Sequence, residues 1–158
     1  MSNVAKARGS RGFTLVELIV TVVIIGILVG MALPLARNSL KREREIELRQ
    51  ALREMRLAID KYKDFATAGL IPPGKIDSDK YPETLQQLVE GVKLNGQVDK
   101  KIRFLRRIPI DPMTGNTEWG KRSLQDDPDS DSSNGDNVFD VYTKSAGTGL
   151  DGTEYKSW

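Results

Sequence analysis

A single carboxylate stands in a long apolar stretch near the start of the chain. Between residues 13 and 36, Glu17 is the only charged side chain. An ionised carboxylate in hydrocarbon is strongly disfavoured, so such a group is held protonated or is paired with a cation. The sequence therefore predicts either a specific partner for Glu17 or a position at an interface with water, where no partner is needed.

A second group of side chains suits metal chemistry. Five Asp residues fall within residues 126–137, and carboxylate oxygens at this density are typical ligands of calcium. The spacing does not match an EF-hand loop that starts at Asp129, because Asn134 occupies the position that requires Gly and no Glu closes the loop. The composition favours a mobile, solvated linker of Asp and Ser over a calcium site in this stretch.

The chain lacks the residue types on which many catalytic sites depend. Its 158 residues contain no Cys and no His, which excludes disulfides, thiol chemistry and the commonest general base and metal ligand. The sequence also shows no nucleophile–base pair, no phosphate-binding Gly loop and no closed set of metal ligands. We therefore do not expect an enzyme.

The element that carries Glu17 is the apolar run itself. As a helix with a rise of ~1.5 Å per residue, residues 13–36 are roughly 36 Å long, enough to cross a hydrocarbon core of about 30 Å. Three bases and no acid precede this run, at Lys6, Arg8 and Arg11. We predict a leader peptide at 1–12 and a transmembrane helix at 13–36.

The junction between leader and helix reads Gly12-Phe13-Thr14-Leu15-Val16-Glu17-Leu18. This motif resembles the processing signature of type IV prepilins and type II secretion pseudopilins, and Pro34 matches a proline that these proteins often carry in the same helix. The resemblance implies that a prepilin peptidase cuts between Gly12 and Phe13 and that Phe13 is then N-methylated. It also implies a single-pass protein of the bacterial inner membrane, with a cytoplasmic N-terminus and a periplasmic C-terminal domain.

The same resemblance implies that subunits assemble through this helix into a helical homopolymer. Glu17 would then pair with the ammonium group of Phe13, on the same subunit or on a neighbour, and set the subunit register. Gly26 and Gly30 form a G-x-x-x-G pair that allows close helix approach, although glycine is common in spanning helices. Pro34 cannot donate a backbone hydrogen bond to Gly30, which indicates either a stretch that loosens on assembly or a tolerated kink.

Residues 37–66 contain no Gly or Pro and carry one apolar stripe. The stripe recurs every three or four residues, which is typical of an amphipathic helix that continues into the periplasm, at Leu48, Leu52, Met55, Ile59, Tyr62 and Ala66. Because it is too short for a sustained heptad repeat, we favour packing on the chain's own sheet over a free coiled coil. We expect Glu45 to pair with Arg49 on the polar face.

Residues 67–158 have the pattern of a small periplasmic α/β head. Residues 81–91 indicate a short helix, with Pro82 in its first turn and Gly91 as its C-terminal cap. Three extended runs follow, at 103–108, 117–122 and 138–143. We therefore predict an α+β, pilin-like fold, in which a long N-terminal helix, transmembrane and then amphipathic, packs on a small antiparallel β-sheet.

Two features favour the secretion branch of this superfamily. Type IV pilins usually close a C-terminal loop with a disulfide, which a chain without Cys cannot form, and the segment Pro109-Ile110-Asp111-Pro112 looks like one in major pseudopilins of the G type. Those proteins bind a structural calcium near the C-terminus. The resemblance thus implies Asp151 as the first ligand, assisted by Asp140 or Asp136, and the alternative is a Gly-rich turn with Trp158 packed on the domain.

These observations together predict a structural subunit of the type II secretion pseudopilus, which drives export of folded proteins across the outer membrane. The expected partners are further copies of the chain, prepilin peptidase/methyltransferase, the inner-membrane assembly platform, minor pseudopilins and membrane lipid. Without the leader the side chains carry 21 bases against 22 acids, which argues against nucleic acid as the main partner. A type IV pilin or minor pilin in adhesion or DNA uptake, and a tethered binding module that does not polymerise, are the alternatives.

Overall fold

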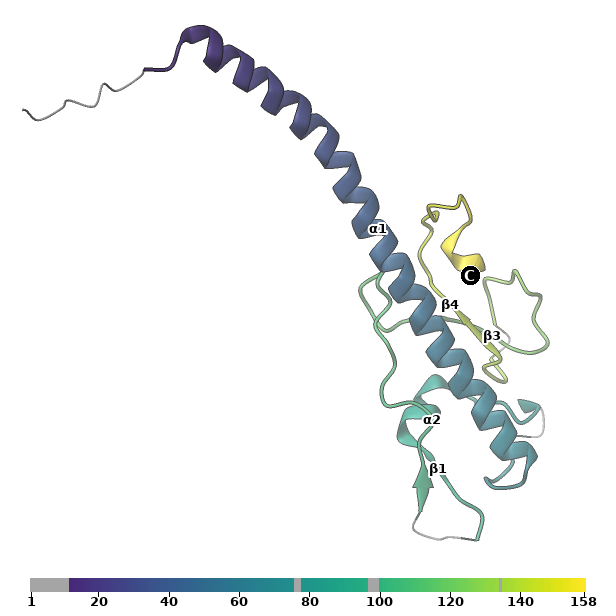
Figure 1. Ribbon diagram of the computed structural model, residues 1–158. Helices are drawn as coiled ribbons and strands as arrows, with labels where there is room; N and C mark the ends of the chain where they lie inside the picture. Colours follow the sequence, from purple (N-terminus) through teal and green to yellow (C-terminus); the bar gives the residue numbers. More distant parts are fainter. Residues whose placement is uncertain (1–11, 76–77, 97–99, 134) are drawn as a thin grey trace, which may run out of the picture. The chain divides into compact units, whose positions relative to one another are not determined.

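The computed structural model describes residues 12–75, 78–96, 100–133 and 135–158, with the backbone alone for residues 31–36. Its elements follow the order shown in Figure 1: α1 (Leu15–Thr67), α2 (Leu85–Glu90), β1 (Val92–Lys93), β2 (Lys101–Ile102), β3 (Gly120–Arg122), β4 (Asp140–Tyr142) and the 3₁₀ helix η2 (Tyr155–Ser157). One long helix followed by short antiparallel strands confirms the predicted α+β fold. The chain divides into two compact units, Met1–Leu40 and Lys41–Trp158.

In the first unit, α1 begins at Leu15 because Thr14 caps it. The backbone N–H of Glu17 donates to Thr14 Oγ1 at 3.2 Å, and the N–H of Leu18 donates to the Thr14 carbonyl at 3.1 Å. The Leu18 bond is the first backbone hydrogen bond of the helix, and the Glu17 N–H, which the first turn would otherwise leave unsatisfied, has the Thr14 side chain as its acceptor.

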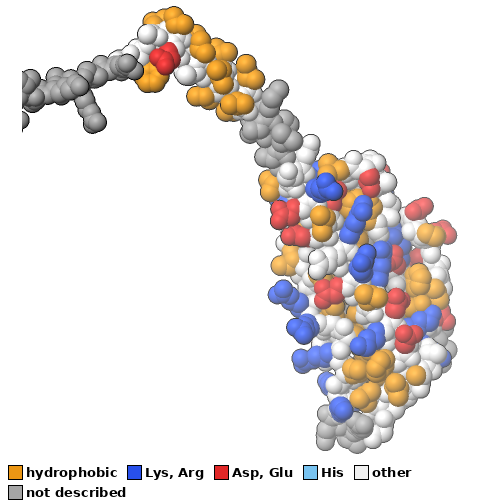
Figure 2. All heavy atoms as spheres, in the orientation of Figure 1, with side chains coloured by type: hydrophobic (Ala, Val, Ile, Leu, Met, Phe, Trp, Pro, Cys, Tyr) orange, Lys and Arg blue, Asp and Glu red, His pale blue; other side chains and the backbone are white. Residues whose placement is uncertain are grey.

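The large apolar side chains from Leu15 to Val29 are each at least 50% exposed, and they form the orange surface of this unit in Figure 2. Within the described part of the chain, no helix has an apolar stretch of the length needed to cross a bilayer. Most of the predicted leader, residues 1–11, and the side chains of 31–36 in the predicted span lie outside the described residues.

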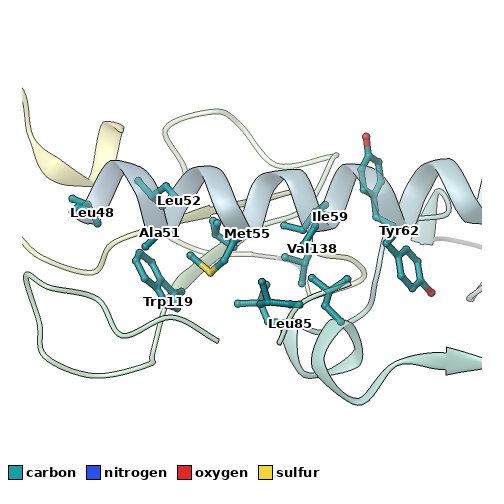
Figure 3. Packing of buried hydrophobic residues seen from close by; sticks show 14 of the residues in the cluster. Leu48, Ala51, Leu52, Met55, Ile59, Tyr62, Leu85, Trp119 and Val138 are labelled. Atoms are coloured by element: carbon teal, nitrogen blue, oxygen red, sulfur yellow. The ribbon is translucent and has the colours of Figure 1, made fainter. Parts of the chain in front are cut away.

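In the second unit, α1 supplies one side of the core. The predicted stripe is confirmed, because all six of its residues from Leu48 to Ala66 are 7% exposed or less. Trp119, Leu85 and Val138, from three other parts of the head, cover this stripe (Figure 3). Burying a side chain of this kind contributes about 1.5–3 kcal/mol, so the stripe is what holds the head to α1.

The helix predicted at 81–91 is present but shorter, because Thr84 is its N-cap. The N–H of Gln87 donates to Thr84 Oγ1 at 3.3 Å, and α2 starts at Leu85. The carbonyl of Pro82 instead accepts from the N–H of Val138 at 2.8 Å, which leaves Pro82 outside the helix. The predicted cap at Gly91 is confirmed, with φ of 81° and its N–H bonded to the Gln87 carbonyl at 3.1 Å.

The strands form two separate antiparallel pairs. In β1–β2, Val92 faces Ile102, and in β3–β4, Gly120 faces Tyr142. The runs predicted at 117–122 and 138–143 therefore contain β3 and β4.

The strand predicted at 103–108 is wrong. The N–H groups of Phe104 and Leu105 donate to the carbonyl of Leu88 at 3.0 and 3.1 Å. These two N–H groups bond to α2 and therefore take no part in a β ladder. The chain turns at this point, and the Leu105 side chain is buried.

Candidate functional site

The predicted processing site lies immediately before α1. Residues 12–14 are not helical, and Gly12 and Phe13 are exposed, Phe13 to 76%. A Cβ atom added at Gly12 would meet nothing within 4 Å. The peptide bond between Gly12 and Phe13 is therefore exposed to solvent. Exposed segments without regular structure are preferred sites of proteolysis.

Glu17 lies one helical turn beyond Phe13, in the first turn of α1, and its side chain is exposed. A carboxylate in this position interacts favourably with the partial positive charge of the helix N-terminus. The Thr14-x-x-Glu17 spacing is that of a capping box, a signal for this helix start that is already present in the sequence. The structure contains the Thr14 half of that box, the bond from the Glu17 N–H to Thr14 Oγ1.

The other predicted assembly residues lie farther along the same helix. A Cβ atom added at Gly26 or Gly30 would meet nothing within 4 Å, so the two glycines leave open surface on α1. The backbone of α1 is helical through position 34, and the side chain of Pro34 lies outside the described residues. The roles predicted for these residues concern contacts between subunits and stay predictions.

A different set of polar contacts fastens residues 145–158 to the second half of α1. Glu45 is 8% exposed, and its Oε1 accepts hydrogen bonds from the Leu150 N–H at 2.8 Å and from the Tyr155 hydroxyl at 3.0 Å. The pair predicted between Glu45 and Arg49 is therefore wrong. The Glu45 side chain points into the protein, because its buried carboxylate accepts hydrogen bonds from these two donors of the 145–158 segment.

Arg49 binds the same segment from the outside. Its Nη2 lies 3.3 Å from Asp151 Oδ2, and its guanidinium carbon lies 4.1 Å from the centre of a Trp158 ring. The Arg49 and Asp151 side chains are 60% and 46% exposed, so this ion pair by itself adds little stability.

Arg56 is the third contact from α1. It donates to both carboxylate oxygens of Asp140, at 2.6 and 3.2 Å, to the Val141 carbonyl at 3.3 Å and to the main-chain oxygen of Trp158 at 2.6 Å. Arg122 Nη1 lies 3.8 Å from the same Asp140 carboxylate. A bidentate guanidinium–carboxylate pair is geometrically specific, so Arg56 fixes β4 and Trp158 at one point of the helix.

The three candidate calcium ligands do not come together. Asp151 Oδ1 accepts from the Thr153 N–H at 3.0 Å and the Thr153 hydroxyl at 2.7 Å, and these bonds, with Arg49 nearby, lower the pKa of Asp151. Asp140 is bound by arginines, and Asp136 is exposed in the acidic stretch.

Among the described residues, no three acidic side chains gather around a common point. The site that the resemblance implies is thus not assembled here, since two of its carboxylates already bind protein donors. A turn at Gly149 brings Asp151 and Trp158 together, and Trp158 packs against the core, while the calcium ligands stay predictions.

The acidic stretch at 126–137 is tied to the head at both ends. Asp126 Oδ2 accepts from the Ser123 N–H at 2.6 Å, and Asn137 Oδ1 accepts from the Leu124 N–H at 3.0 Å. Between these points Asp127, Asp129 and Asp131 are exposed. These acidic side chains are solvated, as the composition predicts, but the stretch is not a mobile linker. It is also held between its ends, where Arg122 Nε donates to the Ser130 carbonyl and the Tyr142 hydroxyl donates to the Asp131 carbonyl, both at 3.0 Å.

Three comparisons with known proteins bear on this arrangement. A family described as "Prokaryotic N-terminal methylation motif" matches residues 7–33. The chain is 30% identical over 118 residues to type II secretion system core protein G of Pseudomonas aeruginosa, covering 72% of this chain and 70% of that protein. It is 30% identical over 117 residues to the protein of the same name from Klebsiella michiganensis, with 70% and 72% covered. No solved structure matches the chain.

Proposed function

The chain belongs to the family of type II secretion system core protein G, the major pseudopilins, and from that premise we propose how it works. It is a structural subunit of the pseudopilus, which polymerises through its N-terminal helix and drives export of folded proteins across the outer membrane. The observation that carries this proposal is the 30% identity over most of both chains. It is supported by the methylation motif at residues 7–33, which includes the exposed apolar start of α1.

The N-terminal motif supports a defined order of events. Prepilin peptidase removes residues 1–12, which releases an ammonium group on Phe13, and that group is N-methylated. Glu17 follows four residues later, about one helical turn along. Its carboxylate pairs with the Phe13 ammonium of the same subunit or a neighbour, which offsets the penalty for a charge among apolar side chains.

The assembly helix has the surface that a polymer of this kind needs. Large apolar side chains from Leu15 to Val29 are exposed in the single chain, and removing them from water on contact with lipid or neighbouring helices is favourable. The open surfaces at Gly26 and Gly30 allow neighbouring backbones to approach closely. Residues 13–36 then anchor the subunit in the inner membrane as a single pass, with the head in the periplasm.

The other candidate functions have less support. A type IV pilin or minor pilin shares the methylation motif, but the relatives that cover most of this chain carry the name of the secretion protein. A tethered binding module that does not polymerise leaves the motif at Gly12 and Phe13 without a purpose. Copies of the chain, the peptidase, minor pseudopilins and the assembly platform are the partners that fit.

The N-terminal mass of the chain recovered from membranes tests this proposal. Co-expression with prepilin peptidase should yield a chain that begins at N-methylated Phe13, and omission of the peptidase should leave the leader in place. Gly12→Val should block cleavage without affecting the head, because a side chain at position 12 meets no neighbour. A leader that persists with the peptidase present, or a cut after Ala36, would contradict the proposal and favour the tethered or secreted module.

A further inference from the structure

The segment at 145–158 is fastened to α1 by protein side chains at the place where a cation was expected. We propose that Glu45, Arg49 and Arg56 form a metal-free clasp that holds this segment, so that the folded head does not require calcium. This inference concerns the head alone and does not depend on polymerisation.

The first argument is that the candidate ligands are already engaged. Calcium takes six to eight oxygen ligands, with carboxylates prominent among them. Asp151 accepts two bonds from Thr153 on Oδ1, and Arg49 lies 3.3 Å from its Oδ2. Both oxygens of Asp140 accept from Arg56. A cation at either carboxylate would therefore compete with a guanidinium group for its oxygens and would be repelled by the positive charge of that group.

The second argument is that the clasp holds the segment at separate points along α1. Glu45 and Arg56 lie eleven positions apart on α1, about 16 Å along the helix. Glu45 accepts from Leu150 and Tyr155, while Arg56 donates to the main-chain oxygen of Trp158. Two points of attachment at this separation fix both the position and the direction of the segment.

The third argument is that the segment is also closed on itself between these points. The Tyr155 and Trp158 rings meet edge to face, with centroids 5.0 Å apart, and Trp158 Nε1 donates to Thr153 Oγ1 at 2.5 Å. Figure 1 shows η2 beside β4, the strand whose Asp140 carries the Arg56 pair. Thr153, Arg49 and Arg56 thus bind the carboxylates that a calcium ion would coordinate.

Thermal unfolding of the full chain in detergent micelles, followed by tryptophan fluorescence, tests the metal dependence. The unfolding midpoint should be the same in excess EDTA and in millimolar calcium chloride. A midpoint that rises by several degrees with calcium, and no longer does so after Asp151→Asn, would overturn the proposal and restore a calcium site at Asp151.

Hydrogen–deuterium exchange of the 145–158 peptide tests the clasp itself. Arg56→Gln should raise the exchange rate of this peptide roughly tenfold, since local opening sets protection, and calcium should not reverse the effect. Arg53→Gln is the matched control, because Arg53 is exposed and three positions away on the same helix. Equal exchange in the two variants would contradict the clasp. If Arg56→Gln unfolds the whole head, Arg49→Gln, which alters a side chain that is 60% exposed, must still raise exchange in this peptide alone.

Discussion

At the scale of single residues, the Tyr155 hydroxyl links the C-terminal segment to α1 and responds to pH. Burial, and then the hydrogen bond to Glu45, raise the pKa of Tyr155 from 10.0 to about 12, with smaller contributions from the negative charges of Glu45 and Asp151. The folded state therefore prefers the neutral phenol, while the unfolded chain releases the proton near the ordinary value.

The sign of the effect follows from that difference. The contribution of Tyr155 to stability is fully present below about pH 10 and is lost as the pH rises to about 12. Tyr155→Phe should be less stable than the parent at about pH 8, because it lacks the bond to Glu45, and the gap should close or reverse above about pH 11.

Urea unfolding of both proteins across this pH range measures the gap directly. The comparison isolates Tyr155, because lysines and other tyrosines titrate equally in the two proteins. A gap that does not change with pH would mean that the phenol ionises as easily in the folded protein as in the unfolded chain.

At the scale of elements, the junction of α2 and β1 depends on Gly91. This residue has φ of 81°, and a Cβ atom placed on it would lie 2.6 Å from the carbonyl oxygen of Ile102, the partner of Val92 in the β1–β2 pair. A side chain at position 91 would therefore combine an unfavourable backbone conformation with a clash against the paired strand.

Gly91→Ala should lower the free energy of unfolding by about 1–3 kcal/mol more than Gly115→Ala does. Gly115 is the matched control, since its φ is 76° but an added Cβ atom would meet nothing within 4 Å. Urea midpoints of the two variants give the comparison. Equal losses would show that only the backbone conformation matters and that β1 and β2 separate easily.

At the scale of the whole molecule, the role proposed for Glu17 connects processing with assembly. Glu17→Gln should leave cleavage after Gly12 intact but reduce the amount of filament recovered from cells by well over tenfold, since breaking an ion pair in an apolar environment costs about 3–5 kcal/mol. Glu43→Gln is the control, because Glu43 is also an exposed acid on α1 but lies outside the apolar run.

Mass spectrometry of the subunit and quantification of sheared filaments report the two steps separately. Normal filaments from processed Glu17→Gln protein would show that the carboxylate does not act in assembly. Loss of cleavage in the same variant would assign Glu17 to recognition by the peptidase.

The local features of this chain could be predicted from its sequence because their causes are local. The stripe from Leu48 to Ala66 is buried as expected, since helical periodicity alone decides which side chains share a face. Gly91 ends α2 as expected, because few other residues adopt a positive φ. The motif at Gly12 and Phe13 indicated a prepilin-like chain for the same reason: its residues are consecutive.

Only the tertiary structure decided the partners of the charged residues. Glu45 suited a local pair with Arg49 but binds Leu150 and Tyr155, more than a hundred positions away, and Arg56 and Asp140 are separated by 84 positions. Such contacts depend on how the head folds back on α1, which helical spacing does not specify. Asp140 and Asp151 could be recognised in the sequence as possible metal ligands. Whether such a carboxylate binds a metal ion or an arginine depends on which groups the fold brings within bonding distance.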